Sequence, residues 1–155
     1  MRKMRRFKQQ LSQENCIKIL QQEPRGVLSV LGEDGYPYGM PLDHFYYEGK
    51  LYFHCAKSGH KLDAIKKYDK VSYCVMDKGY KKPGEWALNI KSVIVFGHIK
   101  VVEDHEKVLQ ICTMLAHKFT DDEDYIANEI KHAGPAVICL ELTPDAITGK
   151  LVNES

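Results

Sequence analysis

The chain has 155 residues, of which 22 are basic and 21 acidic, and its formal net charge is +1. That length suits one domain with a real core and one ligand cleft. The near equality of basic and acidic residues argues against a dedicated nucleic-acid binder. No apolar run is long enough to cross a bilayer, and no apolar signal-peptide segment follows the basic residues 1–8. We therefore expect neither nucleic acid nor a membrane as a partner.

The five cysteines are far apart, odd in number, and include no C-x-x-C pair. Reduced thiols in the cytoplasm fit this pattern better than a disulfide framework or a zinc site. Asp43, His44 and His54 could suggest another metal, but strand alternation sends Asp43 and His44 to opposite faces. We therefore predict a cytoplasmic location and no metal site.

Periodicity and end signals predict four helices, over residues 12–22, 60–68, 104–119 and 121–131. Ser12 could cap the first helix, and Asp104 or Asp121 could cap the last two. Pro24 ends the first. All four are expected within one domain, residues 1–155, with the basic arm and first helix in 1–24 and the helical pair in 104–131.

Six segments read as strands: 26–31, 36–46, 50–56, 71–76, 92–102 and 136–142. Most are joined by turns of hairpin length, which implies antiparallel pairing. Gly97 suggests a bulge or a sharp bend. Twisted antiparallel strands lose their exposed edges when the sheet closes. The predicted fold is mainly β, a small six-stranded antiparallel barrel with peripheral helices.

Residues 52–61 (YFHCAKSGHK) carry the strongest chemical signal. They predict the end of a strand, a turn of small residues, and a helix whose first turn carries cations. A helix N-terminus attracts anions, Gly59 lets the backbone approach one closely, and His60 and Lys61 could add charge-assisted hydrogen bonds. A phosphorylated cofactor would fit this turn. An ordinary strand-turn-helix with solvated basic residues would give the same pattern.

Alternation along 50–56 places Leu51, Phe53 and Cys55 on one face, which suits the core, and His54 and Ala56 on the other. His54 is therefore open to two interpretations. Its imidazole could donate a hydrogen bond to a bound nitro or carbonyl oxygen. It could equally be a half-buried histidine that bonds a backbone carbonyl.

Four segments in order, 25–29 (RGVLS), 34–42 (DGYPYGMPL), 52–61 and 92–97 (SVIVFG), carry a family resemblance. The chain resembles the pyridoxamine 5'-phosphate oxidase-like FMN-binding split barrels, and among them the 5-nitroimidazole resistance (Nim) branch. The likeness spans nearly the whole sequence. The combination of PY-x-x-P with YFH-x-A-x-x-G-H-K is its most specific part.

The resemblance implies a homodimer with FMN in a groove between two barrels. It implies that Met40, Pro41 and Leu42 run their backbone along the isoalloxazine ring, and that His54, Cys55 and Ala56 flank the flavin. Gly59, His60 and Lys61 would hold the phosphate, where an Arg-Lys pair is common in the family. Ser92 would reach the flavin from the partner subunit or the barrel floor.

The family likeness favours an FMN-dependent oxidoreductase that reduces small planar acceptors such as nitroaromatic compounds, with His54 as the candidate catalytic residue. No triad, paired carboxylates or P-loop is present in the sequence, as expected where the cofactor carries the chemistry. Three alternatives remain: a flavin-binding or storage protein without turnover, a pyridoxamine 5'-phosphate oxidase-like enzyme, and a haem-handling relative with His54 or His44 as axial ligand.

Overall fold

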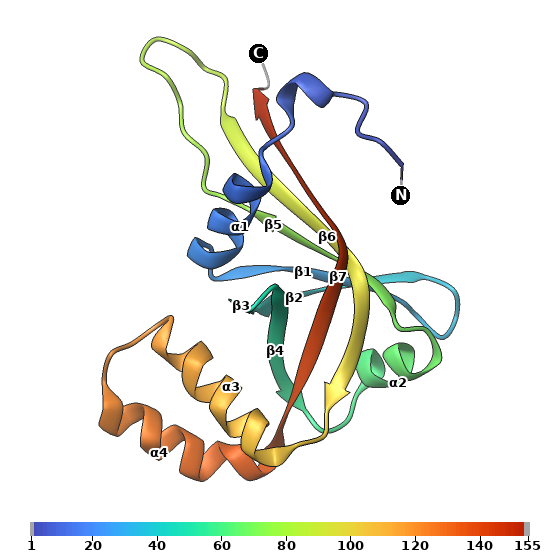
Figure 1. Ribbon diagram of the computed structural model, residues 1–155, viewed down its shortest axis with the longest axis vertical. Helices are drawn as coiled ribbons and strands as arrows, with labels where there is room; N and C mark the ends of the chain where they lie inside the picture. Colours follow the sequence, from blue (N-terminus) through green and yellow to red (C-terminus); the bar gives the residue numbers. More distant parts are fainter. Residues whose placement is uncertain (1, 154–155) are drawn as a thin grey trace.

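The computed structural model describes residues 2–153, which form one curled antiparallel sheet with helices around it (Figure 1). The strands are β1 (Arg25–Leu31), β2 (Pro37–Asp43), β3 (Phe45–Tyr47), β4 (Lys50–Ala56), β5 (Lys70–Met76), β6 (Asn89–Val102) and β7 (Val137–Asn153). The α-helices are α1 (Gln13–Gln22), α2 (His60–Lys67), α3 (His105–His117) and α4 (Glu123–Ala133), and short 3-10 turns span η1 (Phe7–Gln9) and η2 (Gly134–Ala136).

The strand order β2-β1-β5-β6-β7-β4-β3 shows how the sheet closes. β2 and β3 are its two edges, although only His44 separates them in the chain. The sheet must therefore curl until its edges meet, as in a barrel. This is the predicted split barrel with seven strands instead of six, because the segment 36–46 is not one strand: it breaks where the side chain of His44 turns into the core.

β6 and β7 are long and pair from Asn89 with Asn153 to Val102 with Cys139. The predicted end of the last strand at Leu142 is therefore wrong. Pro144 lies opposite Gly97 and the register shifts there, so Asp145 is the extra residue of a bulge. A Cβ on Gly97 would collide with the carbonyl oxygen of Thr143. The bulge predicted at Gly97 is confirmed, and it lets a proline remain inside a paired strand.

The helix caps follow the predicted chemistry with one exception. The Ser12 hydroxyl accepts the N–H of Asn15 at 3.2 Å and caps α1. The Asp104 carboxylate caps α3. α4 is capped by Asp122 and not by Asp121. Adjacent aspartates can both serve as caps, so the sequence alone could not choose between them.

Two apolar clusters hold these elements together. Alternate side chains fill the barrel interior, among them Leu28, Phe53, Tyr73, Val95 and Leu142. The second cluster packs α3 onto the outer face of the sheet through Tyr52, Val102, Val108, Ile111 and Cys139. Each buried side chain of this size contributes roughly 1.5–3 kcal/mol. The outer cluster fixes the helical pair beside β4.

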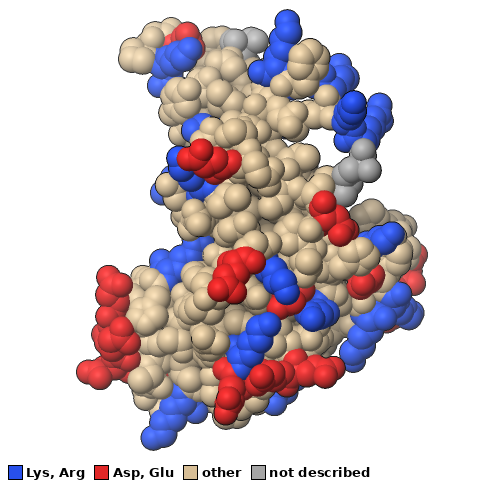
Figure 2. Space-filling model, viewed as in Figure 1, with Lys and Arg blue, Asp and Glu red and all other residues tan. Residues whose placement is uncertain are grey.

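Figure 1 shows α3 and α4 at one end of the sheet, beside β4, and α2 on the other side of that end. The first half of β6 and the last half of β7 extend away from this end, together with the loop 77–88 and the N-terminal arm. Figure 2 shows basic side chains over the arm and acidic ones around the start of α4. Among the described residues, no helix combines the length and apolarity needed to span a membrane.

Candidate functional site

The turn from β4 into α2 leaves backbone donors open. Gly59, the N-cap, has φ +137°, which side chains rarely adopt, and a Cβ there would meet nothing within 4 Å. Its carbonyl accepts the N–H groups of Leu62 at 3.0 Å and Asp63 at 3.3 Å. The N–H groups of His60 and Lys61 have no acceptor within residues 2–153, as is usual at a helix start. This arrangement is suited to holding an anion.

The side chains beside this turn add cationic or donor groups. The His60 ring lies edge-on to the ring of Tyr38 on β2, with 4.6 Å between centroids. Lys61 is half-buried. Burial raises the pKa of the neighbouring Cys55 thiol, and the charge of Lys61 acts in the opposite direction. The start of α2, the end of β4 and the edge strand β2 therefore meet in one place.

The three β2 residues expected along the flavin ring differ in burial. The Met40 side chain is in the core, Pro41 is exposed and Leu42 is half-buried. The Leu42 carbonyl lies 2.7 Å from the hydroxyl of Tyr73. Because β2 is an edge of the sheet, it leaves one row of backbone N–H and C=O groups unpaired within the sheet. A ligand could bond this backbone beside Pro41, whereas the Met40 side chain faces inward.

The predicted alternation along β4 is confirmed. Leu51, Phe53 and Cys55 are buried, whereas His54 and Ala56 are exposed. The Cys55 side chain therefore points away from the face that carries His54. Within residues 2–153 no hydrogen bond engages the His54 imidazole. The interpretation of His54 as a histidine that bonds a backbone carbonyl is thus wrong, and its ring is available to a ligand.

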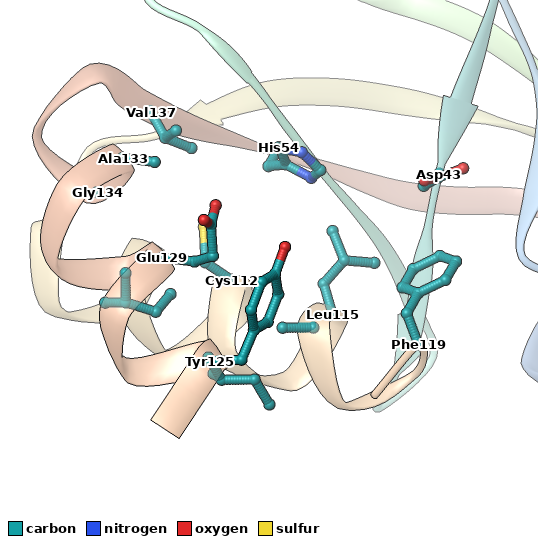
Figure 3. Close-up of a pocket in the computed structure, with 13 residues that line it drawn as sticks. Asp43, His54, Cys112, Leu115, Phe119, Tyr125, Glu129, Ala133, Gly134 and Val137 are labelled. Carbon is teal, nitrogen blue, oxygen red and sulfur yellow. The ribbon is translucent and has the colours of Figure 1, made fainter. Parts of the chain in front are cut away.

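His54 lines a pocket of about 230 Å³ between β4 and the helical pair. Figure 3 shows His54 from the sheet and Cys112 from α3 projecting into it, with Tyr125 and Glu129 on the α4 side. The remaining lining is mostly apolar. Asp43, at the end of β2, lies at the rim. The pocket could accept a small planar molecule with a few polar contacts.

Ser92 lies elsewhere in the same chain. It pairs with Met76 at the end of β5, whereas α2 leads into Lys70 at the start of that strand. A strand of this length places those ends roughly 20 Å apart. Ser92 instead borders a separate pocket, which is lined by Arg2 of the N-terminal arm, Lys150 of β7 and other residues of these segments and of β6. One chain brings His54, Ala56, Gly59, His60 and Lys61 together and leaves Ser92 out.

The sequence model of the pyridoxamine 5'-phosphate oxidase family matches residues 12–151. The chain belongs to this family. No curated protein matches the chain. The resemblance stated from the motifs is therefore confirmed at the level of the family.

Solved structures share the fold of this oxidase-family chain at low sequence identity. A protein of Bacteroides thetaiotaomicron, assigned provisionally to 5-nitroimidazole antibiotic resistance, is 18% identical, with a TM-score of 0.79 over 93% of this chain and 87% of that one. An FAD-binding protein of Mesorhizobium loti is 21% identical, with a TM-score of 0.66 over 92% and 96%. An FAD- and haem-binding protein of Mycobacterium smegmatis is 18% identical, with a TM-score of 0.75 over 95% and 74%.

His44 has a structural role in this family member that the sequence did not reveal. It is fully buried, with Nε2 2.6 Å from the Leu20 carbonyl and Nδ1 2.9 Å from the Tyr73 hydroxyl. Burial and the nearby Lys118 lower its pKa to about 4, so the ring is neutral at pH 7. Nε2 must carry the proton that the Leu20 carbonyl accepts, so the neutral ring can only accept at Nδ1, and the single proton of the Tyr73 hydroxyl lies between Nδ1 and the Leu42 carbonyl. With both nitrogens engaged, His44 is not free to ligate haem.

Glu141 on β7 is a second buried polar group in this oxidase-family fold. Its carboxylate is 1% exposed and accepts hydrogen bonds from Lys50 at 2.8 Å, Lys107 at 2.9 Å and Tyr52 at 3.2 Å. These partners lie on β4 and α3, so the carboxylate joins the helical pair to the sheet. Only the interruption of the apolar run 138–142 by a charge could have signalled this role.

Proposed function

We propose that this protein binds FMN on the outer face of β4 and serves as a flavin-dependent reductase of small planar acceptors such as nitroaromatic compounds. The observation that carries the proposal is the juxtaposition of the open N-terminus of α2 with the exposed face of His54 and Ala56 in a pyridoxamine 5'-phosphate oxidase family chain. FAD-binding proteins among the structural relatives support a flavin of some kind.

The residues at the turn fit a phosphate. Two free backbone N–H groups, the open space above Gly59 and the ammonium of Lys61 supply donors and positive charge at one point. His60 has a ring nitrogen that can donate as well. A histidine replaces the arginine that is common at this position of the family, and its contact with Tyr38 holds it at the edge of β2.

The rest of the flavin would lie along β4 toward the pocket. Bound FMN supplies a hydride acceptor and donor at its ring. Ala56 leaves room for the cofactor, and His54 can donate a hydrogen bond to negative charge that develops on an acceptor in the pocket. The apolar wall from α3 and α4 would exclude water from that contact.

A second copy of the chain would complete the site. Ser92 lies roughly a strand length from α2 in one chain, so a homodimer would be needed to bring it to the flavin. The loop 77–88 leaves Trp86 75% exposed and Tyr80 48% exposed. Aromatic side chains of this kind are common at protein interfaces, which supports the homodimer.

Lys61→Ala is expected to weaken FMN binding about tenfold to a hundredfold, because a hydrogen bond to a charged group contributes roughly 1.5–3 kcal/mol. Titration of the apoprotein with FMN, followed by quenching of flavin fluorescence, measures the dissociation constant. Lys66→Ala is the matched control, since Lys66 has the same charge but lies in the last turn of the same helix. Equal FMN affinity in both variants would show that the phosphate does not bind at this turn. Tighter binding of FAD than of FMN in the same titration would show that FAD is the cofactor.

His54→Ala is expected to keep FMN affinity nearly unchanged and to slow reduction of a nitroimidazole about tenfold to a hundredfold, by loss of one charged hydrogen bond. Oxidation of a reduced nicotinamide in the presence of the acceptor measures the rate. His54→Gln, which keeps a donor, should recover part of it. Stoichiometric FMN without turnover in the wild type would favour a flavin-binding protein, and a Soret band in the purified protein would favour the haem relative.

A further inference from the structure

Two thiols meet beside the pocket that His54 lines. The Sγ atoms of Cys112 on α3 and Cys139 on β7 are 3.8 Å apart. Among the described residues, no other two cysteines make such a contact. Cys139 is the β7 partner of His54 in the sheet register. The pair therefore lies at the junction of the helical pair, the sheet and the pocket.

The two thiols differ in access and in chemistry. Cys112 is half-buried and lines the pocket, so a small molecule in the pocket can reach it (Figure 3). Cys139 is fully buried and directs its thiol toward the Val108 carbonyl. The contact with Cys139 lowers the pKa of Cys112, whereas the pKa of Cys139 is raised by the same contact and by burial. This is the asymmetry of an attacking thiol with a resolving partner.

We propose that Cys112 and Cys139 are a redox-active dithiol, which hydrogen peroxide or a small organic peroxide converts into a disulfide. The Cys112 thiol releases a proton, and the resulting thiolate attacks the peroxide. The O–O bond breaks, the sulfur becomes a sulfenic acid, and the departing hydroxide or alkoxide takes up one proton, which balances the one released, and leaves as water or alcohol. The Cys139 sulfur then attacks the Cys112 sulfur. The S–O bond breaks, and the departing hydroxide takes the Cys139 proton and leaves as water. Two thiols are oxidised by two electrons and one peroxide is reduced.

The local structure permits this bond. The two sulfurs must approach by roughly 2 Å to reach disulfide length. α3 is held by the outer apolar cluster and by Lys107, which lies five residues before Cys112 and bonds Glu141, so neither element has to separate from the other. The disulfide would cross-link α3 to β7 and fix one wall of the pocket opposite His54. The modification thus acts on the pocket whether or not a flavin occupies the protein.

The test uses the reduced full-length protein treated with hydrogen peroxide, blocked with N-ethylmaleimide under denaturing conditions, and mapped by mass spectrometry of its peptides. The expected result is one species that has lost two hydrogen atoms, with Cys112 linked to Cys139, three alkylated cysteines (Cys16, Cys55 and Cys74), and full reversal by dithiothreitol. Because this readout uses the wild type, it does not depend on the folding of a variant.

Variants separate the two roles. In Cys139→Ser, dimedone should trap a sulfenic acid at Cys112, and in Cys112→Ser the folded protein should leave Cys139 unoxidised. Cys74→Ser, which removes a half-buried thiol on β5, should form the disulfide in the same yield as the wild type. The proposal is overturned if Cys112 and Cys139 are alkylated separately after peroxide treatment, if Cys112 proceeds to sulfinic acid in the wild type, or if the linkage that forms involves Cys74.

Discussion

Glu141→Gln is expected to lower the free energy of unfolding at pH 7 by about 3 kcal/mol. The carboxylate is 1% exposed and lies between Lys50 on β4 and Lys107 on α3. Burial alone would raise its pKa, but the hydrogen bonds and charges of these two lysines outweigh burial and lower the pKa to about 2. A glutamine leaves the two ammonium groups without their counter-charge at a buried oxygen.

The pH dependence follows from the same pair of pKa values. The carboxyl titrates near 4.5 in the unfolded chain and near 2 in the folded one, so its stabilisation is complete above pH 4.5 and is lost as the pH falls toward 2. Urea unfolding curves at pH 7, 4.5 and 3 measure this loss. The difference in unfolding free energy between the wild type and Glu141→Gln should become smaller below pH 4.5. Glu103→Gln, a change at an exposed carboxylate, is the matched control, and an undiminished gap at pH 3 would contradict the assignment.

His44→Ala is expected to destabilise the protein by about 3–4 kcal/mol, because it opens a cavity and leaves the Leu20 carbonyl without its hydrogen-bond donor. The ring bonds the Leu20 carbonyl and the Tyr73 hydroxyl and is fully buried where β2 gives way to β3. The loss should appear as a lower urea concentration at the unfolding midpoint, with little change in the dependence of the unfolding free energy on urea concentration. His105→Ala, at an exposed position, should change the midpoint little.

The buried His44 should also make the stability depend on pH, over a range above that of Glu141. Its pKa is about 4 in the folded chain and 6.5 when unfolded. The folded state therefore binds fewer protons, and stability falls as the pH drops from 6.5 to 4, by about 3 kcal/mol in total. The His44→Ala variant should lack this decrease in stability between pH 6.5 and 4. A wild-type stability that stays flat between pH 6.5 and 4.5 would show that the imidazole is charged inside the fold.

Local chemistry made part of this molecule predictable. Strand alternation placed Cys55 inside and His54 outside, and the caps Ser12 and Asp104 act as expected, because each depends on residues close in the sequence. Gly97 signalled a bulge for the same reason. The turn at Gly59 was recognisable as a strand-to-helix transition with cations beside it.

What the sequence could not provide were the distant partners. The segment 36–46 reads as one strand in the sequence, so no local signal shows that His44 interrupts the strand and bonds Leu20 and Tyr73. The extension of β7 beyond Pro144 depends on a bulge opposite Gly97, which only the pairing of β6 with β7 reveals. The contacts of Cys112 with Cys139 and of Lys107 with Glu141 arise because α3 folds back over the sheet.

The order of strands has a consequence for synthesis on the ribosome. β7 lies between β6 and β4, so the hairpin of β3 and β4 pairs with the rest of the sheet only through it. Until Val137 and the residues after it have emerged, the nascent chain contains two groups of strands that do not pair with each other, β2-β1-β5-β6 and β4-β3. The edges of β4 and β6 are then open, and such edges pair readily with other chains. Premature termination before this segment should therefore yield aggregating product rather than a smaller stable barrel.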